Sequence, residues 1–148
     1  MTGTVAHLVR NWLPHTQTFI HEVVAGADRY RPAVYAEVYL ENPSFETACT
    51  YLITRSQVDA IEDTNPGFRE QFFSELDYPN CFEETCRQQT VSILHAHFGF
   101  TGSDSLRLKE ETGLPLVTSF YGIDASKYLQ DGRTYEKLFD QGDLFLSL

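Results

Sequence analysis

Two histidines, His95 and His97, have the spacing in this sequence that most directly suggests chemistry. They stand in a His-x-His arrangement directly after a short apolar run at residues 91–94. Alternate residues of a strand point to the same face, and metal hydrolases use this spacing at strand ends to hold an ion. The sequence shows no further group of histidines or carboxylates with ligand spacing, so we assign no metal ligand. His97 is the better candidate for a functional site, whereas His95 is expected to pack within its strand.

A second polar segment, Tyr121-Gly122-Asp124, follows the apolar run at residues 116–120. The phenol of Tyr121 can both donate and accept a hydrogen bond. The carboxylate of Asp124 has two open interpretations: it lines a binding site, or it caps the turn that contains Ser126. The segment is therefore the second place where we expect ligand contacts.

One helix is expected to join the two apolar runs. Residues 99–102 have the composition of a loop, Ser103 or Asp104 could cap a helix that runs to about Thr112, and Gly113 follows as an end signal. The loop could offer backbone amides to an anion, or it could simply lead into the helix cap. A strand–helix–strand unit has parallel strands and a right-handed crossover. Since ligands bind outside the carboxyl ends of such strands, both polar segments belong to one predicted site.

The remainder of the chain repeats this alternation of strand and helix. Further strands are expected at residues 4–9, 33–40, 50–54 and 143–148, and helices at about 18–26 and 134–141. The first helix could be capped by the Thr18 hydroxyl and ends at Gly26, and His7 is expected to be a core or edge residue of the first strand rather than a ligand. Residues 57–89 give only a weak signal. The pattern predicts one α/β domain, Rossmann-like and three-layered, with a mostly parallel sheet.

The overall charge excludes some classes of function. A net charge of −10 argues against a nucleic-acid footprint and against simple attraction to anionic lipid. The acidic, lysine-poor composition also suggests, as a hypothesis, a source with high internal salt.

The absence of a long apolar run or a signal-like start suggests a cytoplasmic protein. The three cysteines, Cys49, Cys81 and Cys86, lack metal or redox spacing and are expected to be buried, reduced thiols.

Four segments of the chain resemble, in order and spacing, the N-terminal half of the family 4 (group 1) retaining glycosyltransferases of the GT-B fold. These segments are LPHTQTFIHEVV, ILHAHFG, TGLPLVTSFYGID and LFDQGDLFLSL, and they span residues 13–148. Members of that family show a Pro-x-x-Ser/Thr-x-Thr-Phe helix start, a His-x-His-Phe strand end, a Thr-Phe-His-Gly-x-Asp strand end and an Ala-Asp-x-hydrophobic final strand. The middle of the chain matches poorly.

The resemblance implies a hexosyltransferase that moves a sugar, with retention, from a nucleotide sugar to a glycan or a lipid-linked acceptor. In such enzymes the N-terminal half binds mainly the acceptor, and the C-terminal half binds the donor. Residues 1–148 are then an acceptor-side domain, truncated before its C-terminal partner domain and inactive alone. The implied enzyme needs no cofactor, builds polysaccharide or glycolipid in the cytoplasm, and could touch a membrane peripherally.

The resemblance also implies site residues. It assigns catalytic positions to His97 and Tyr121. It assigns substrate-binding positions to the following residues: Gly122, Asp124, Gly99, His15, Thr18 and Arg10. At the position of Tyr121 the family usually has a histidine, and a tyrosine cannot carry positive charge near pH 7. The first loop also lacks the paired glycines that some members place near the donor phosphates, for which Arg10 or His15 could compensate.

Two alternatives stay open on the sequence alone. The chain could be a self-contained, flavodoxin-like binding or interaction module that uses the same sheet edge without catalysis. It could also be a metal-dependent hydrolase, which would have to contain stoichiometric zinc or manganese.

Overall fold

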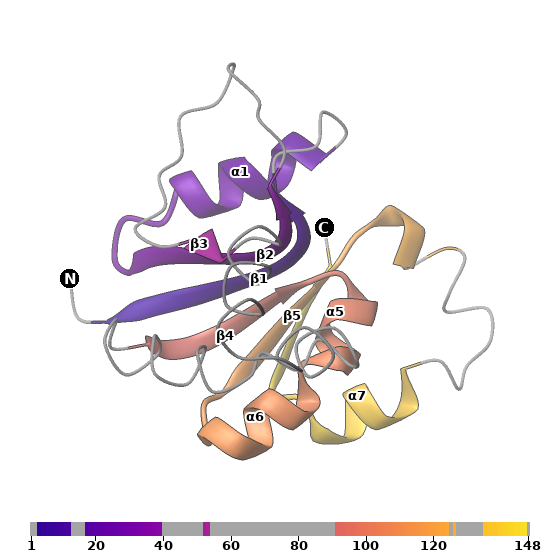
Figure 1. Ribbon diagram of the computed structural model, residues 1–148. Coiled ribbons are helices and arrows are strands. Elements are labelled where there is room, and N and C mark those ends of the chain that lie inside the picture. Colours follow the sequence, from indigo (N-terminus) through magenta and orange to yellow (C-terminus); the bar gives the residue numbers. More distant parts are fainter. Residues whose placement is uncertain are drawn as a thin grey trace, which may run out of the picture.

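A six-stranded parallel sheet forms the centre of the protein (Figure 1). The computed structural model describes residues 3–12, 17–39, 52–53, 91–124, 126 and 135–147. The strands are β1 (Thr4–Trp12), β2 (Arg31–Tyr39), β3 (Leu52–Ile53), β4 (Val91–His97), β5 (Leu116–Phe120) and β6 (Leu144–Ser147). The helices are α1 (Thr18–Ala25), α5 (Gly99–Asp104), α6 (Leu106–Thr112) and α7 (Glu136–Gln141).

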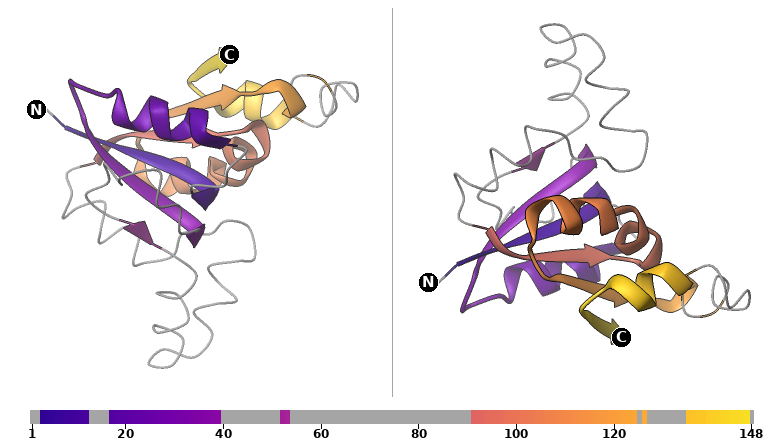
Figure 2. Two further views of the ribbon diagram at one scale, coloured as in Figure 1. Left: turned by 90° about the horizontal axis from the view of Figure 1, so that it is seen from above. Right: turned by 90° about the horizontal axis from the view of Figure 1, so that it is seen from below.

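The strand order, β3-β2-β1-β4-β5-β6, is that of a Rossmann sheet. The order reverses between β1 and β4, because the chain proceeds outward from β1 to β3 on one side and from β4 to β6 on the other. Helix α1 covers one face of the sheet, and α5, α6 and α7 cover the other, as the views from above and below show (Figure 2). The predicted α/β, Rossmann-like, parallel architecture is therefore confirmed.

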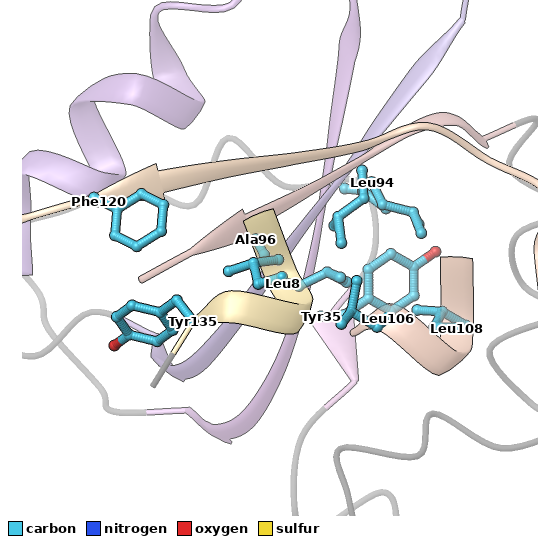
Figure 3. Close-up of a cluster of buried hydrophobic side chains, with 12 residues drawn as sticks. Leu8, Tyr35, Leu94, Ala96, Leu106, Leu108, Phe120 and Tyr135 are labelled. Atoms are coloured by element: carbon cyan, nitrogen blue, oxygen red, sulfur yellow. The ribbon is translucent and has the colours of Figure 1, made fainter. Parts of the chain in front are cut away.

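The larger hydrophobic cluster lies on the face that carries α5, α6 and α7 (Figure 3). Because successive strand residues alternate between faces, it takes Leu8 from β1 and Leu94 and Ala96 from β4. Leu106 of α6 and Leu138 of α7 cover it on the side away from the sheet. Burial of these side chains holds the two helices to the strands.

The second cluster lies on the opposite face and anchors α1. Its helix residues are Ile20 and Val24, which lie one turn apart and are both buried. They pack with Val9 and Trp12 of β1 and with Tyr121, which follows β5. This cluster therefore ties the first helix to the carboxyl end of the sheet, where the predicted site lies.

Several predicted boundaries differ from the structure. Strand β1 continues to Trp12, so Arg10 is a strand residue and not part of a loop. The extension forms because β1 is central and its last residues keep pairing with β2, as Trp12 does with Tyr39. Strand β2 begins at Arg31, before the predicted start. Helix α1 begins at Thr18 as predicted, but no side chain caps it, so the expected bond from the Thr18 hydroxyl is wrong.

The loop predicted at residues 99–102 is helical. Helix α5 begins at Gly99 and a second helix, α6, follows after Ser105. The Ser105 hydroxyl donates to the Thr101 carbonyl at 2.6 Å, within the turn where the two helices meet. Gly113 ends α6 with a φ of 68°, as a glycine in the C′ position should.

Some predictions fall outside the described residues. These are His15, the three cysteines and residues 57–89. Within the part of the chain that the structure describes, no helix is long and apolar enough to cross a membrane.

Candidate functional site

The carboxyl ends of β1, β4 and β5 bring the predicted site residues together. His97 is the last residue of β4 and pairs with Ser119 in β5, and Tyr121 directly follows β5. This edge includes the position where the strand order reverses, which is where ligands bind in sheets of this order. The sheet topology thus places both polar segments of the sequence at one edge.

His97 is fully buried and sits in the middle of a hydrogen-bonded chain. Its Nδ1 lies 2.7 Å from the Tyr121 hydroxyl, and its Nε2 lies 3.0 Å from Nδ1 of His7. Burial lowers the pKa of His97 well below its usual value, and the neighbouring histidines lower it further. The imidazole is therefore neutral, with one donor nitrogen and one acceptor nitrogen.

Tyr121 is buried and remains protonated. Burial is the main cause that raises the pKa of its phenol; a side-chain hydrogen bond with Ser119 acts in the opposite direction, and the Asp124 carboxylate adds a smaller increase. A protonated phenol and a neutral imidazole can share their hydrogen bond in either direction. The tautomer of His97 therefore decides whether the Tyr121 hydroxyl has a proton or a lone pair available for another partner.

His7 and His95 lie beside His97 on the same face of the sheet. His95 Nε2 lies 2.8 Å from the Ser119 hydroxyl, and the His95 and His97 rings stack with centroids 4.4 Å apart. Burial lowers the pKa of His7 to about 3 and that of His95 to about 4. The sequence predicted a core or edge position for His7 and did not connect it with the His-x-His pair. Its position in the middle of a predicted central strand was the available signal.

Phe98, between β4 and α5, has a backbone conformation that is unusual for an aromatic residue. Its φ of 77° and ψ of 148° lie in a region that glycine normally occupies. The conformation is held because the Phe98 amide donates to the Ser119 carbonyl at 2.9 Å and the ring packs against Tyr121 and Phe100. Such strain commonly occurs at functional edges, and here it directs α5 away from the end of β4.

Asp124 fixes the start of α5. Its Oδ2 accepts the amides of Gly99 at 3.0 Å and Tyr121 at 3.3 Å, and the side chain is fully buried. Burial raises the pKa of Asp124, while the two amide donors act in the opposite direction. The carboxylate thus binds the first amide of α5 and the first amide of the turn that contains Ser126, and its role in ligand binding stays a prediction. Its Oδ1 is buried without a hydrogen-bond partner among the described residues.

The side chains exposed to solvent at this edge belong to other residues than the buried ones described above. Phe19 of α1 is 39% exposed, and its ring centroid lies 4.7 Å from that of Tyr121. Gly122 is exposed and has no atom within 4 Å of where a Cβ would lie. Arg10 is exposed, pairs with Asp104 at 2.7 Å and lies 4.7 Å from the centre of the Phe100 ring. Thr18 is half-buried at the start of α1.

Comparisons with known proteins support the fold. No protein-family model and no curated protein sequence matches the chain. The sucrose-phosphate synthase from Thermosynechococcus elongatus superposes on 97% of this chain, with a TM-score of 0.61 and 8% identity. Phytolacca americana UGT2 complexed with UDP-2fluoro-glucose and pterostilbene superposes on 82% of it, with a TM-score of 0.52 and 12% identity. The apo form of the same UGT2 gives a TM-score of 0.50.

These matches extend over only part of the other proteins. The chain spans 41% of the sucrose-phosphate synthase chain and 30% of each UGT2 chain. At identities of 8–12% the similarity is one of fold, and that fold is the Rossmann-like architecture found in these glycosyltransferase structures.

Proposed function

We propose that this chain is the acceptor-side half of a GT-B glycosyltransferase that transfers a hexose, with retention, from a nucleotide sugar to a glycan or lipid-linked acceptor. One observation carries the proposal. The chain shares its fold with a sucrose-phosphate synthase over 97% of its own length, but the match covers only 41% of that protein. A protein of this class needs a second domain to hold the donor, so residues 1–148 supply one half of the site.

The exposed groups at the carboxyl edge are suited to contact the acceptor. The ring of Phe19 can pack against the apolar face of a sugar or a lipid, and the Gly122 backbone leaves room for a close approach. Arg10 offers a cation for a phosphate, although it must exchange its partner Asp104 to do so. His15 keeps its predicted binding role as part of this proposal.

The buried groups behind them position the reacting atoms. In a retaining transfer without a metal, the leaving diphosphate can accept the proton of the acceptor hydroxyl, so the protein contributes orientation and fixed dipoles. The bond between His97 Nδ1 and the Tyr121 hydroxyl sets which way the phenol points its proton. The Asp124 carboxylate fixes the backbone of Gly99 and Tyr121 by accepting both of their amides. We therefore assign Tyr121 to substrate contact, and His97 and Asp124 to positioning.

The first test is to read the gene beyond codon 148. We expect roughly 100–200 further residues, with a basic residue and spaced glutamates after a glycine-rich strand end, as a donor-binding half requires. The 148-residue chain alone should then transfer no sugar, whereas the complete gene product should.

A stop codon directly after residue 148 would contradict the transferase proposal. In that case the chain would have no donor site, and the stand-alone binding module would become the better interpretation. Its ligand would then be sought at the same edge, beginning with Phe19 and Tyr121.

A further inference from the structure

Three histidines from two neighbouring strands meet on the face of the sheet that carries α1. In the register of the sheet His7 of β1 lies beside His95 of β4, and His97 follows two residues later on the same face. One ring nitrogen from each of the three can be chosen so that all lie within 4.8 Å of one another. The centroid of the His7 ring lies 5.2 Å from those of both other rings.

One nitrogen in this group has no partner. Among the described residues Nε2 of His7, a residue that is only 3% exposed, makes no hydrogen bond. Both possible proton arrangements along His7, His97 and Tyr121 leave this atom unsatisfied. If the chain of bonds runs toward Tyr121, His7 Nε2 is a bare acceptor; if it runs the other way, Nε2 carries an unpaired N–H. An ion bound to His7 Nδ1 would likewise leave the proton of this ring on Nε2, so the unpaired nitrogen does not distinguish the metal-free arrangement from the metal-bound one.

The donor set has the chemistry of a transition-metal site. Neutral imidazole is a ligand for zinc and for its neighbours in the first transition series, and burial keeps all three rings neutral at pH 7. Nitrogens bound to one tetrahedral zinc lie roughly 3.3–3.4 Å apart. The separation of 3.0 Å between His7 Nδ1 and His97 Nε2 is close to that value. The third ligand would come from His95, whose Nε2 lies 2.8 Å from the Ser119 hydroxyl, so its ring would have to rotate or bind through Nδ1.

We propose that His7, His95 and His97 bind one Zn²⁺ ion, or a similar transition-metal ion, between β1 and β4. The fourth ligand is a water molecule that enters beside His95, the least buried of the three. The ion would join β1 and β4, the neighbouring strands at which the strand order reverses (Figure 1). With the ion on His97 Nε2, the other nitrogen must carry the proton and donate to Tyr121, so the ion also fixes the orientation of that phenol.

The test uses the 148-residue chain, stripped with EDTA and titrated with ZnSO₄ by calorimetry and with Co²⁺ by visible absorption at pH 7.5. We expect one ion per chain, the stronger visible absorption of a four-coordinate Co²⁺ ion, and a thermal unfolding midpoint that rises with Zn²⁺ and falls again with EDTA. Mg²⁺, which prefers oxygen ligands, should have no effect.

Matched variants locate the ion. His95→Gln should weaken binding at least tenfold, whereas His21→Gln, which changes a histidine of α1 outside the group, should leave it unchanged. A chain with all three cysteines replaced by serine separates this site from thiolate binding and should keep full affinity. Circular dichroism verifies that each variant is folded.

Two results would overturn the proposal. The first is the absence of any calorimetric or spectroscopic response of the unmodified chain at millimolar Zn²⁺ and Co²⁺, which would make the three histidines a metal-free polar core. The second is binding that survives His95→Gln and disappears in the cysteine-free chain. Because the unmodified chain alone decides the first result, a variant that fails to fold does not affect it.

Discussion

At the scale of single residues, the bond between His97 and Tyr121 is the contact that connects the buried histidines to the proposed substrate. The Tyr121 hydroxyl is 2.7 Å from His97 Nδ1, and both residues are buried. The sequence predicted that these two residues share one edge. It could not predict that His97 is fully buried, because burial depends on α1 and on side chains that are distant in the sequence.

Replacing Tyr121 by phenylalanine in the complete gene product should lower kcat/KM for sugar transfer roughly five- to tenfold. One neutral hydrogen bond is worth about 1–1.5 kcal/mol, which corresponds to that factor. The measurement is initial rates with a labelled nucleotide sugar. Tyr30→Phe is the matched control, because Tyr30 directly precedes β2 and therefore lies at the amino end of the strands. Unchanged rates in both Tyr121→Phe and a folded His97 variant would count against the assignment.

The strain at Phe98 gives a second prediction, which concerns stability. Glycine adopts a φ of 77° easily, whereas alanine does not, and the cost of holding a non-glycine residue there is about 1–3 kcal/mol. Both Phe98→Gly and Phe98→Ala lose the aromatic packing. In urea unfolding, the free energy of unfolding of the glycine variant should therefore exceed that of the alanine variant by about 1 kcal/mol or more. At most positions the alanine variant is the more stable of the two. An alanine variant as stable as the glycine variant would refute the strain.

The buried histidines predict how stability depends on pH in chelator-treated protein. The folded-state pKa values of His7, about 3, and His95, about 4, lie below the unfolded value of 6.5. Their contribution is therefore fully present above pH 6.5 and is lost as the pH falls toward those values, because only the unfolded chain binds the protons. Each group contributes a slope of up to about 1.4 kcal/mol per pH unit.

Unfolding in urea at several pH values between about 5 and 6.5 tests this pH dependence. Most carboxylates titrate at lower pH and therefore contribute little to the change in this range. The free energy of unfolding should fall as the pH is lowered across that range, and His95→Gln should make the slope shallower. A free energy that stays constant across the range would show that the histidines bind protons equally in the folded and unfolded chain, which contradicts the lowered pKa values.

At the scale of elements, α5 packs unusually close to its neighbours. A Cβ on Gly99 would lie 2.6 Å from ring atoms of both Phe120 and Tyr135, and one on Gly102 would lie 2.6 Å from the Thr118 hydroxyl. The glycines that suggested a loop in the sequence are needed for this close contact within a helix. This explains why the helix cap was predicted at Ser103 or Asp104 although the helix begins at Gly99: the pattern of glycines is the same for a loop and for a tightly packed helix.

Gly99→Ala should destabilise the folded chain by about 1–3 kcal/mol, because both rings must move to admit the methyl group. Gly122→Ala is the control for the same chemical change, since nothing lies within 4 Å of its Cβ, and it should alter stability by no more than about 0.5 kcal/mol. Chemical denaturation of both variants measures the difference. Equal stabilities would mean that α5 is not packed as closely as described.

At the scale of the whole molecule, the alternation of strands and helices was readable in the sequence. Apolar runs with clear end signals, such as residues 91–94 and 116–120, predicted parallel strands and their common carboxyl edge. Long-range features were not readable. The pairing that places His7 beside His95 is a property of the sheet register, which no local pattern encodes.

The fold shared with glycosyltransferase structures and the polar edge at β1, β4 and β5 together motivate the central claim, that the chain is the acceptor-side half of such an enzyme. The measurement that tests it most directly is sugar transfer by the complete gene product, with a panel of labelled nucleotide sugars and the anomeric configuration of the product determined by NMR. We predict transfer from one donor class, with the configuration of the donor retained. A complete product that neither transfers nor hydrolyses any of these donors would contradict the claim.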